Sequence, residues 1–123
     1  MIDQEARELA VRAAQVADAE HATDVMVLHV GDVLGVTEYF VIGSASNRRL
    51  VSAIVEDVEE QLKLDPGRSP VRVEGFREQQ WVLMDYGDVV VHIHARDVES
   101  FRQSRTQVAA DIARAVSLGR RGL

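Results

Sequence analysis

The chain has 123 residues, enough for one domain with a single core and too few for two. With 46% hydrophobic and 28% charged residues and no low-complexity tract, its composition is globular and excludes a disordered chain. Because there is no cysteine, disulfides and thiolate metal sites are excluded, and a reducing cytoplasm is the simplest location.

The net charge of -6 comes from 20 acidic against 14 basic side chains, which disfavours a phosphate backbone and favours a basic protein partner. The N-terminal stretch carries charges every few positions, unlike the apolar region of a signal peptide. No apolar run approaches the roughly 18 residues that a membrane span needs. We therefore expect a single cytoplasmic domain over residues 1–123 without membrane attachment.

The first predicted element is an amphipathic helix over residues 3–20, with a face of small side chains. Asp3 is available as its N-cap. The apolar residues that recur at helical spacing are Ala6, Leu9, Ala10, Ala13, Val16 and Ala17.

Two strands follow, over residues 24–30 and 39–44, with a turn-rich segment between them. Both are apolar on both faces, so we expect them to be covered on both faces or to lie in a sheet centre. A second helix is predicted after Ser46, a good N-cap, ending at the Leu-Asp-Pro-Gly sequence of residues 64–67. Its inward stripe is Leu50, Ile54, Val58 and Leu62, and its solvated acidic face is Glu56, Asp57, Glu59 and Glu60.

Residues 70–75 predict a short strand near a sheet edge, because proline at its start cannot donate a ladder hydrogen bond. Residues 81–86 and 88–94 predict a hairpin that turns at Gly87, where glycine tolerates a positive φ.

Asp97 can cap a last helix, whose apolar positions are Val98, Phe101, Val108, Ile112 and Val116. The order αββαβββα predicts an α/β fold in which a mixed β-sheet is flanked by helices.

Chemically reactive side chains gather in the predicted hairpin. His92 and His94 share one face of a strand and, with Asp88, could approach one metal ion. However, structural zinc sites usually have four ligands and the chain has no cysteine, so half-buried sheet histidines bonded to neighbours are the simpler interpretation. We predict no metal site and no cofactor.

Two features allow an enzymatic interpretation. Asp85 and Asp88 flank the turn and can hold magnesium or divide acid and base roles, although such carboxylates commonly cap backbone amides. Gly43 and Ser44 lie between a strand and a helix, like the Gly-Ser turn of nucleotidyltransferases. Those enzymes have an acidic pair on the next strand, whereas here the acidic residues from Glu56 onward lie on a helix. No catalytic residue is predicted.

Trp81 and Tyr86 are candidates for contact with a partner, since both residue types are enriched at interaction hot spots. Strand alternation places Trp81 on one face with Leu83 and Asp85, and Tyr86 on the other. Both aromatics cannot be core if one face of the sheet is wet, so at least one is predicted to meet a partner.

The sequence WVLMDYGDVVVHIH, preceded by VTEYFVIGSASNRRLVSAIVEDVEEQLK and VEGFREQQ, resembles the ribosomal silencing factor family, also called the Iojap-related proteins. The resemblance covers residues 24–94. It implies a nucleotidyltransferase-like α/β fold without the transferase's catalytic residues, which accounts for the Gly-Ser turn. It also implies a homodimer.

The resemblance further implies a translation repressor. Family members bind the large ribosomal subunit through ribosomal protein L fourteen, block its association with the small subunit, and act when nutrients are scarce. Trp81 and Tyr86 match positions of the ribosome-facing surface, and Asp85, Gly87 and Asp88 form the turn. No direct nucleic-acid specificity is implied.

Some positions depart from the family pattern. Glu38 replaces Asp before a Tyr-Phe pair, residues 45–47 replace a Gly-Thr-Ser-like turn, and His94 replaces an aromatic or aliphatic residue. Residues 95–107 lack the aromatic-rich start of the last helix, so the contribution of that helix to docking stays open.

Two alternatives to a docking hairpin are a nucleotidyltransferase-like, nucleotide-binding enzyme and a cytosolic dimerisation module with another partner. The enzyme would use Asp85, Asp88 and His92.

Overall fold

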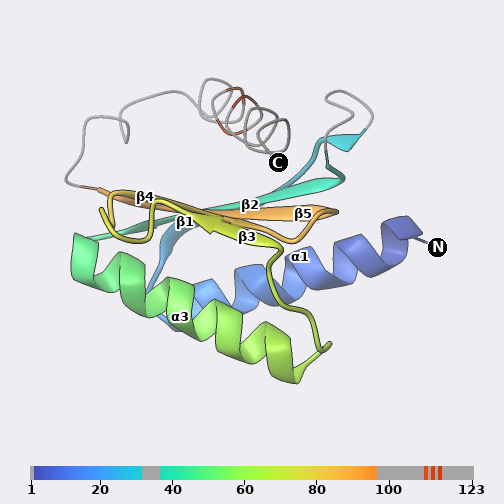
Figure 1. Ribbon diagram of the computed structural model, residues 1–123, viewed down its shortest axis with the longest axis horizontal. Coiled ribbons are helices and arrows are strands. Elements are labelled where there is room, and N and C mark those ends of the chain that lie inside the picture. Colours follow the sequence, from blue (N-terminus) through green and yellow to red (C-terminus); the bar gives the residue numbers. More distant parts are fainter. Residues whose placement is uncertain (1, 32–36, 97–109, 111, 113, 115–123) are drawn as a thin grey trace.

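The computed structural model describes residues 2–31, 37–96, 110, 112 and 114. Its strands form one five-stranded sheet in the order β1-β2-β5-β4-β3, and both described helices lie against the same face (Figure 1). The predicted mixed α/β fold is confirmed. The elements are α1 (Ile2–Ala19), β1 (Thr23–His29), β2 (Tyr39–Ala45), α3 (Arg48–Leu64), β3 (Arg72–Glu74), β4 (Trp81–Asp85) and β5 (Val89–Ala95).

The predicted last helix lies mostly outside the described residues. Three residues of this segment, 110, 112 and 114, are described, and all three are helical. No helix in the described part of the chain is long and apolar enough to span a membrane.

The centre of the sheet is the parallel pair of β2 and β5, in register from Tyr39 opposite Val89 to Ala45 opposite Ala95. Every residue of both strands is buried, as two-sided apolar strands require. The predicted hairpin is confirmed, because β4 and β5 pair antiparallel. The short strand β3 is an edge strand, also as predicted.

The expectation that β1 is covered on both faces is wrong. It is the other edge strand, and its residues are exposed or half-buried. The reason is that its β-branched composition suits any pleated, partly covered surface and does not by itself select the sheet centre.

Two apolar clusters lie on opposite faces of the sheet. The larger one joins the sheet to the helices, and includes all the small and apolar α1 residues predicted to be buried. Alanine at the contact lets α1 approach closely. The smaller cluster covers the opposite face and consists of Val30, Phe40, Ile42, Leu83, Val90 and Ile112.

The helix starts differ from their predictions by one or two residues. The N-cap of α3 is Asn47, whose side-chain oxygen accepts a hydrogen bond of 2.9 Å from the Leu50 amide, and not Ser46. Asn caps as well as Ser, so composition alone does not decide between neighbours. Asp3 lies inside α1, which begins at Ile2, and does not precede it.

The hairpin turn depends on Gly87, which has a φ of 93°. A Cβ added there would meet nothing within 4 Å, so a side chain is disfavoured by the backbone and not by packing.

We expect Gly87→Ala to lower the free energy of unfolding by about 1 kcal/mol in urea titrations, and Gly87→Asn to lower it less, because Asn tolerates positive φ better. Equal stability of the Ala variant and the native protein would contradict this reading.

Candidate functional site

Four of the five predicted partner-binding residues gather at the hairpin turn. Asp85 ends β4, Tyr86, Gly87 and Asp88 form the turn, and Gly87 is exposed at its tip. The fifth, Trp81, begins β4 at the other end of the hairpin, roughly 13 Å from Asp85 at the usual rise per strand residue. The site therefore has two separate parts.

The carboxylate of Asp85 shapes the turn from within. Its Oδ1 accepts a hydrogen bond of 2.8 Å from the Gly87 amide, the arrangement by which Asp stabilises a tight turn. Its Oδ2 lies 3.4 Å from the guanidinium of Arg72 on β3. Asp85 is 4% exposed, so its charge is held inside the fold by these donors.

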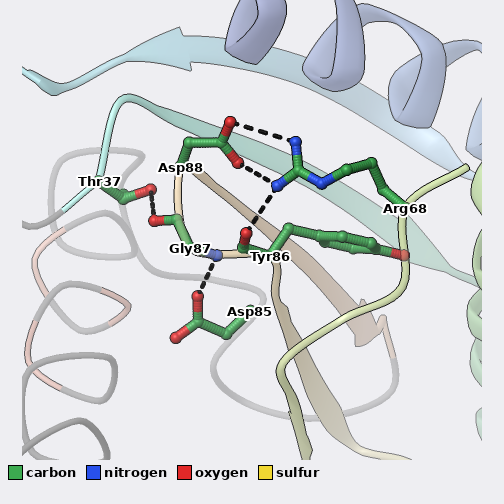
Figure 2. A network of polar contacts seen from close by, with 6 residues as sticks. All are labelled: Thr37, Arg68, Asp85, Tyr86, Gly87 and Asp88. Atoms are coloured by element: carbon green, nitrogen blue, oxygen red, sulfur yellow. Dashed lines mark hydrogen bonds and ion pairs between the residues drawn. The ribbon is translucent and has the colours of Figure 1, made fainter. Parts of the chain in front are cut away.

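A second cation fixes the turn from outside the hairpin (Figure 2). The Arg68 guanidinium contacts both oxygens of Asp88, at 2.8 and 3.4 Å, and donates a hydrogen bond of 2.9 Å to the Tyr86 carbonyl. Paired, fork-like contacts of this kind specify geometry as well as adding stability. The loop that follows α3 is thereby tied to the turn.

The segment before β2 completes the network. The Thr37 hydroxyl donates a hydrogen bond of 3.0 Å to the Gly87 carbonyl (Figure 2). The amides of Glu38 and Tyr39 donate to the carbonyl of Asp88 at 2.9 and 3.2 Å. Segments that are distant in sequence thus form hydrogen bonds to one turn, whose Gly87 is exposed.

Tyr86, one of the predicted partner-binding residues, lies in the core. It is 2% exposed and belongs to the larger cluster, on the helix side of the sheet. Burial raises the pKa of its hydroxyl, Glu59 adds to the increase, and Arg68 opposes it. The strand alternation that separated Trp81 from Tyr86 is confirmed, and Tyr86 is the core member of the pair.

Trp81 lies on the opposite face and is half-buried. Its ring centroid is 5.2 Å from that of His92, which is 5.0 Å from that of His94. The indole Nε1 and both ring nitrogens of His92 are buried, and within the described structure none of them has a hydrogen-bond partner. Unsatisfied buried polar atoms are costly and rare in folded proteins, which marks this end of the hairpin as unusual.

The two histidines differ in their partners. His94 Nε2 lies 3.1 Å from the Ser44 hydroxyl on the neighbouring strand. Gly43 and Ser44 lie within β2 and not in a turn between a strand and a helix, as the sequence had suggested. Burial lowers the pKa of His94, while Asp24 opposes the shift. Burial lowers the pKa of His92 well below 6.5, and the charge of His94 adds to this effect. Both rings are therefore neutral in the folded protein near pH 7.

The groups proposed for an enzyme do not come together. Asp85 and Asp88 are engaged by the turn and its arginines, whereas His92 stacks on Trp81. Among the described residues no group of three or more His, Asp or Glu side chains is arranged to hold a metal ion. What this arrangement offers is a rigid turn and an aromatic ring.

A family model described as "Ribosomal silencing factor during starvation" matches residues 3–104. The chain belongs to the ribosomal silencing factor family. The ribosomal silencing factor of Bacillus subtilis is 35% identical over 89 residues, covering 72% of this chain and 75% of the relative. The chloroplastic Iojap protein of Arabidopsis thaliana is 32% identical, covering 74% of this chain and 37% of that longer protein.

Two solved structures share the fold of this chain. A structure from Bacillus halodurans has a TM-score of 0.66 and 30% identity, covering 80% of this chain and 88% of that one. One from Chromobacterium violaceum has a TM-score of 0.68 and 28% identity, covering 82% and 83%. The family assignment rests on the sequence match, and the two solved structures support the fold. Its name describes a regulatory role on the ribosome.

Sequence reasoning missed the residues that hold the turn. Thr37, Arg68 and Arg72 were not singled out, because each comes from a different segment and has no motif of its own. Arg68 lies in the loop after Pro66 and Gly67, where nothing local distinguishes a turn anchor from a solvated arginine. Only the placement of β3 beside β4 brings this loop to the hairpin.

The neutral state of His92 predicts a pH dependence of this silencing factor's stability. In the unfolded chain His92 takes up a proton near pH 6.5, whereas in the folded protein its pKa lies well below that value. The free energy of unfolding is therefore unaffected by this histidine above pH 6.5 and decreases as the pH falls below it. In urea titrations the native protein should lose unfolding free energy between about pH 7.5 and about pH 5.5. We expect this loss to be smaller by about 1 kcal/mol in His92→Leu.

At the higher pH His92→Leu should be nearly as stable as the native protein, because neither ring nitrogen loses a hydrogen bond. The exposed histidine His21, which forms no ion pair within the described structure, provides the control, and His21→Asn should retain the loss at acidic pH. An unchanged acid loss in His92→Leu would show that this ring titrates freely in the folded state.

Proposed function

We propose that this protein represses translation by docking on the large ribosomal subunit through ribosomal protein L fourteen, so that the small subunit does not join, when nutrients are limited. The observation that carries the proposal is the family match over residues 3–104. A mouse relative, 34% identical over 76 residues, is named for mitochondrial assembly of the ribosomal large subunit, which supports that subunit as the target. In this proposal the protein acts in the cytoplasm, as one domain and without a cofactor.

The hairpin turn supports the proposal as a rigid contact. Gly87 is exposed, while its backbone is held by Asp85 and Thr37 and its two neighbours are held by Arg68. A surface that is already ordered loses little conformational entropy on binding, so more of its contact energy appears as affinity.

Trp81 supplies the aromatic part of the proposed surface. A standard interface buries about 800 Å² on each partner, a patch roughly 30 Å across, so one partner can contact both Trp81 and the turn. The unpaired indole Nε1 is a donor that a partner's carbonyl or carboxylate can satisfy after a small rearrangement. In this proposal Tyr86 and Asp85 support the turn from inside, and Trp81, Gly87 and Asp88 face the partner.

Charge complementarity favours a protein contact over an RNA contact. The net charge of -6 repels phosphate and attracts a basic ribosomal protein, mainly increasing the association rate and the orientation of encounter. The proposed mechanism needs no chemical step. The carboxylates of Asp85 and Asp88 act as structural hydrogen-bond acceptors in it, not as acids or bases.

Substitutions at the two ends of β4 test the docking site. We expect Trp81→Ala to weaken binding to isolated large subunits by about 2 kcal/mol, or roughly thirtyfold, in co-sedimentation, because it removes the aromatic anchor. Tyr86→Phe should bind as the native protein does, since the hydroxyl has no hydrogen-bond partner within the described structure. Tyr86→Ala should lose about 3 to 5 kcal/mol of stability, as for other buried aromatics.

The control is Glu8→Ala on the exposed side of α1, which should leave binding unchanged. If Trp81→Ala is folded by circular dichroism and still binds large subunits with the affinity of the native protein, Trp81 is not part of the contact surface. Failure of the native protein to co-sediment at all would remove the ribosomal proposal itself.

We further propose a homodimer formed along β1. Among the described strands this edge strand has only β2 as a neighbour, and its apolar residues 25–28 are all half-buried. A long apolar edge strand is a template for pairing with another chain, and antiparallel pairing with a second copy would be self-complementary.

Sedimentation equilibrium should therefore return twice the monomer mass of 13.7 kDa at tens of micromolar protein. Amide hydrogen exchange along β1 should slow as the protein concentration rises, because outward-facing amides become paired in the dimer. A monomer mass, or exchange in β1 that does not depend on concentration, would count against this dimer.

A further inference from the structure

A groove of about 610 Å³ lies between α3 and β3, at the edge of the sheet. Its position is separate from the proposed ribosomal contact at Trp81, because α3 covers one face of the sheet and Trp81 belongs to the cluster on the other (Figure 1). The residues that line it are Val55, Glu56, Glu59, Glu60, Lys63, Val73 and Phe76.

The groove contains an apolar surface that can receive a side chain. Val55 is buried at 1% exposure, Val73 is half-buried, and the Phe76 side chain remains 39% exposed beside them. Phe76 is one of the few large hydrophobic side chains left exposed in the described part of the chain. Covering this ring with another apolar side chain would be favourable by the ordinary hydrophobic effect.

Three carboxylates and one ammonium group surround the apolar surface. Glu56, Glu59 and Glu60 are exposed, and none of them forms a hydrogen bond or ion pair within the described structure. Lys63 is the single positive group that lines the groove. The three carboxylates outnumber this one ammonium group, so the groove keeps a net negative charge around a hydrophobic surface, which repels phosphate and attracts cationic side chains.

The adjoining strand adds backbone binding capacity. Among the described strands β3 pairs only with β4, and it spans just three residues from Arg72 to Glu74. The outer edge of such a strand can hydrogen-bond an extended segment laid along it, while side chains of that segment enter neighbouring pockets.

We propose that this groove is a second docking site, which takes an extended basic protein segment carrying a central apolar residue. The apolar residue covers Phe76 and Val73, and flanking Arg or Lys side chains meet the carboxylates. A nucleic acid does not fit, because its phosphates would face those carboxylates. The Trp81 ring lies on the opposite face of the sheet from this groove.

The test uses a fluorescein-labelled, capped hexapeptide, Arg-Lys-Leu-Phe-Lys-Arg, and the full chain without ribosomes. Affinity is measured by fluorescence anisotropy, and the site is mapped by backbone amide chemical shifts. The expected result is shifts confined to residues of α3, β3 and the Phe76 loop. Two control peptides, Glu-Glu-Leu-Phe-Glu-Glu and Arg-Lys-Ser-Ser-Lys-Arg, should bind much more weakly, since each lacks one of the two required features.

Variants of exposed groove residues make the test specific. Glu56→Gln combined with Glu59→Gln should raise Kd roughly tenfold, and Phe76→Ala roughly fivefold. Lys63→Gln should lower Kd about twofold by removing the opposing charge. The matched control is Glu5→Gln combined with Glu8→Gln on α1, which changes net charge equally and should leave Kd unchanged.

Equal weakening by both double variants would overturn the proposal in favour of general charge attraction. Shifts centred on β1 or on the hairpin turn at Gly87, or no saturable binding to the native chain, would also overturn it. If the groove variants change the sedimentation mass of the protein but bind the peptide as before, the groove is a surface for self-association, and the proposal is overturned. None of these results depends on ribosome binding, so the two proposals succeed or fail separately.

Discussion

The parallel pairing of β2 with β5 joins segments that are far apart in sequence, and the rest of the structure is arranged around it. Both strands are buried on both faces, so each face needs its own apolar cover and each backbone group needs a partner within the sheet. The same pairing places Thr37 beside the hairpin turn and Ser44 beside His94. Both ends of the hairpin therefore depend on β2 for their neighbours.

The two ends of the hairpin are stabilised in different ways. At the turn the charged groups Asp85, Asp88 and Arg68 have well-placed partners, which fixes the backbone around an exposed glycine. At the other end Trp81 and His92 pack by ring stacking, while their ring nitrogens remain unsatisfied. Local departures from complete hydrogen bonding often occur at functional sites, because a group left unpaired in one state is available in another.

The described structure also separates two chemically different surfaces. The sheet face that carries Trp81 is apolar and contains neutral histidines. The helix face has a buried, alanine-rich contact with α1 and, at the outer side of α3, an acidic groove. The exposed carboxylates of the groove and the Trp81 ring therefore lie on opposite sides of the sheet.

The sequence by itself determined the order of the described elements, the hairpin, the edge position of β3 and the opposite orientations of Trp81 and Tyr86. These features follow from local spacing and from residues such as Gly87, whose conformational preference acts within a single turn. Resemblance of the run from Trp81 to His94 correctly indicated the ribosomal silencing factor family.

Only the tertiary structure decided which apolar strand is central, which aromatic is core and which side chains hold the turn. Two-sided apolar composition predicted burial for β1 as well as β2, but the sheet order leaves β1 at an edge. Tyr86 is buried because α3 packs over its face, and Arg68 reaches Asp88 because β3 returns beside β4. Such contacts join residues that share no local pattern, so their geometry is set by the packing of whole elements and not by the spacing of neighbours.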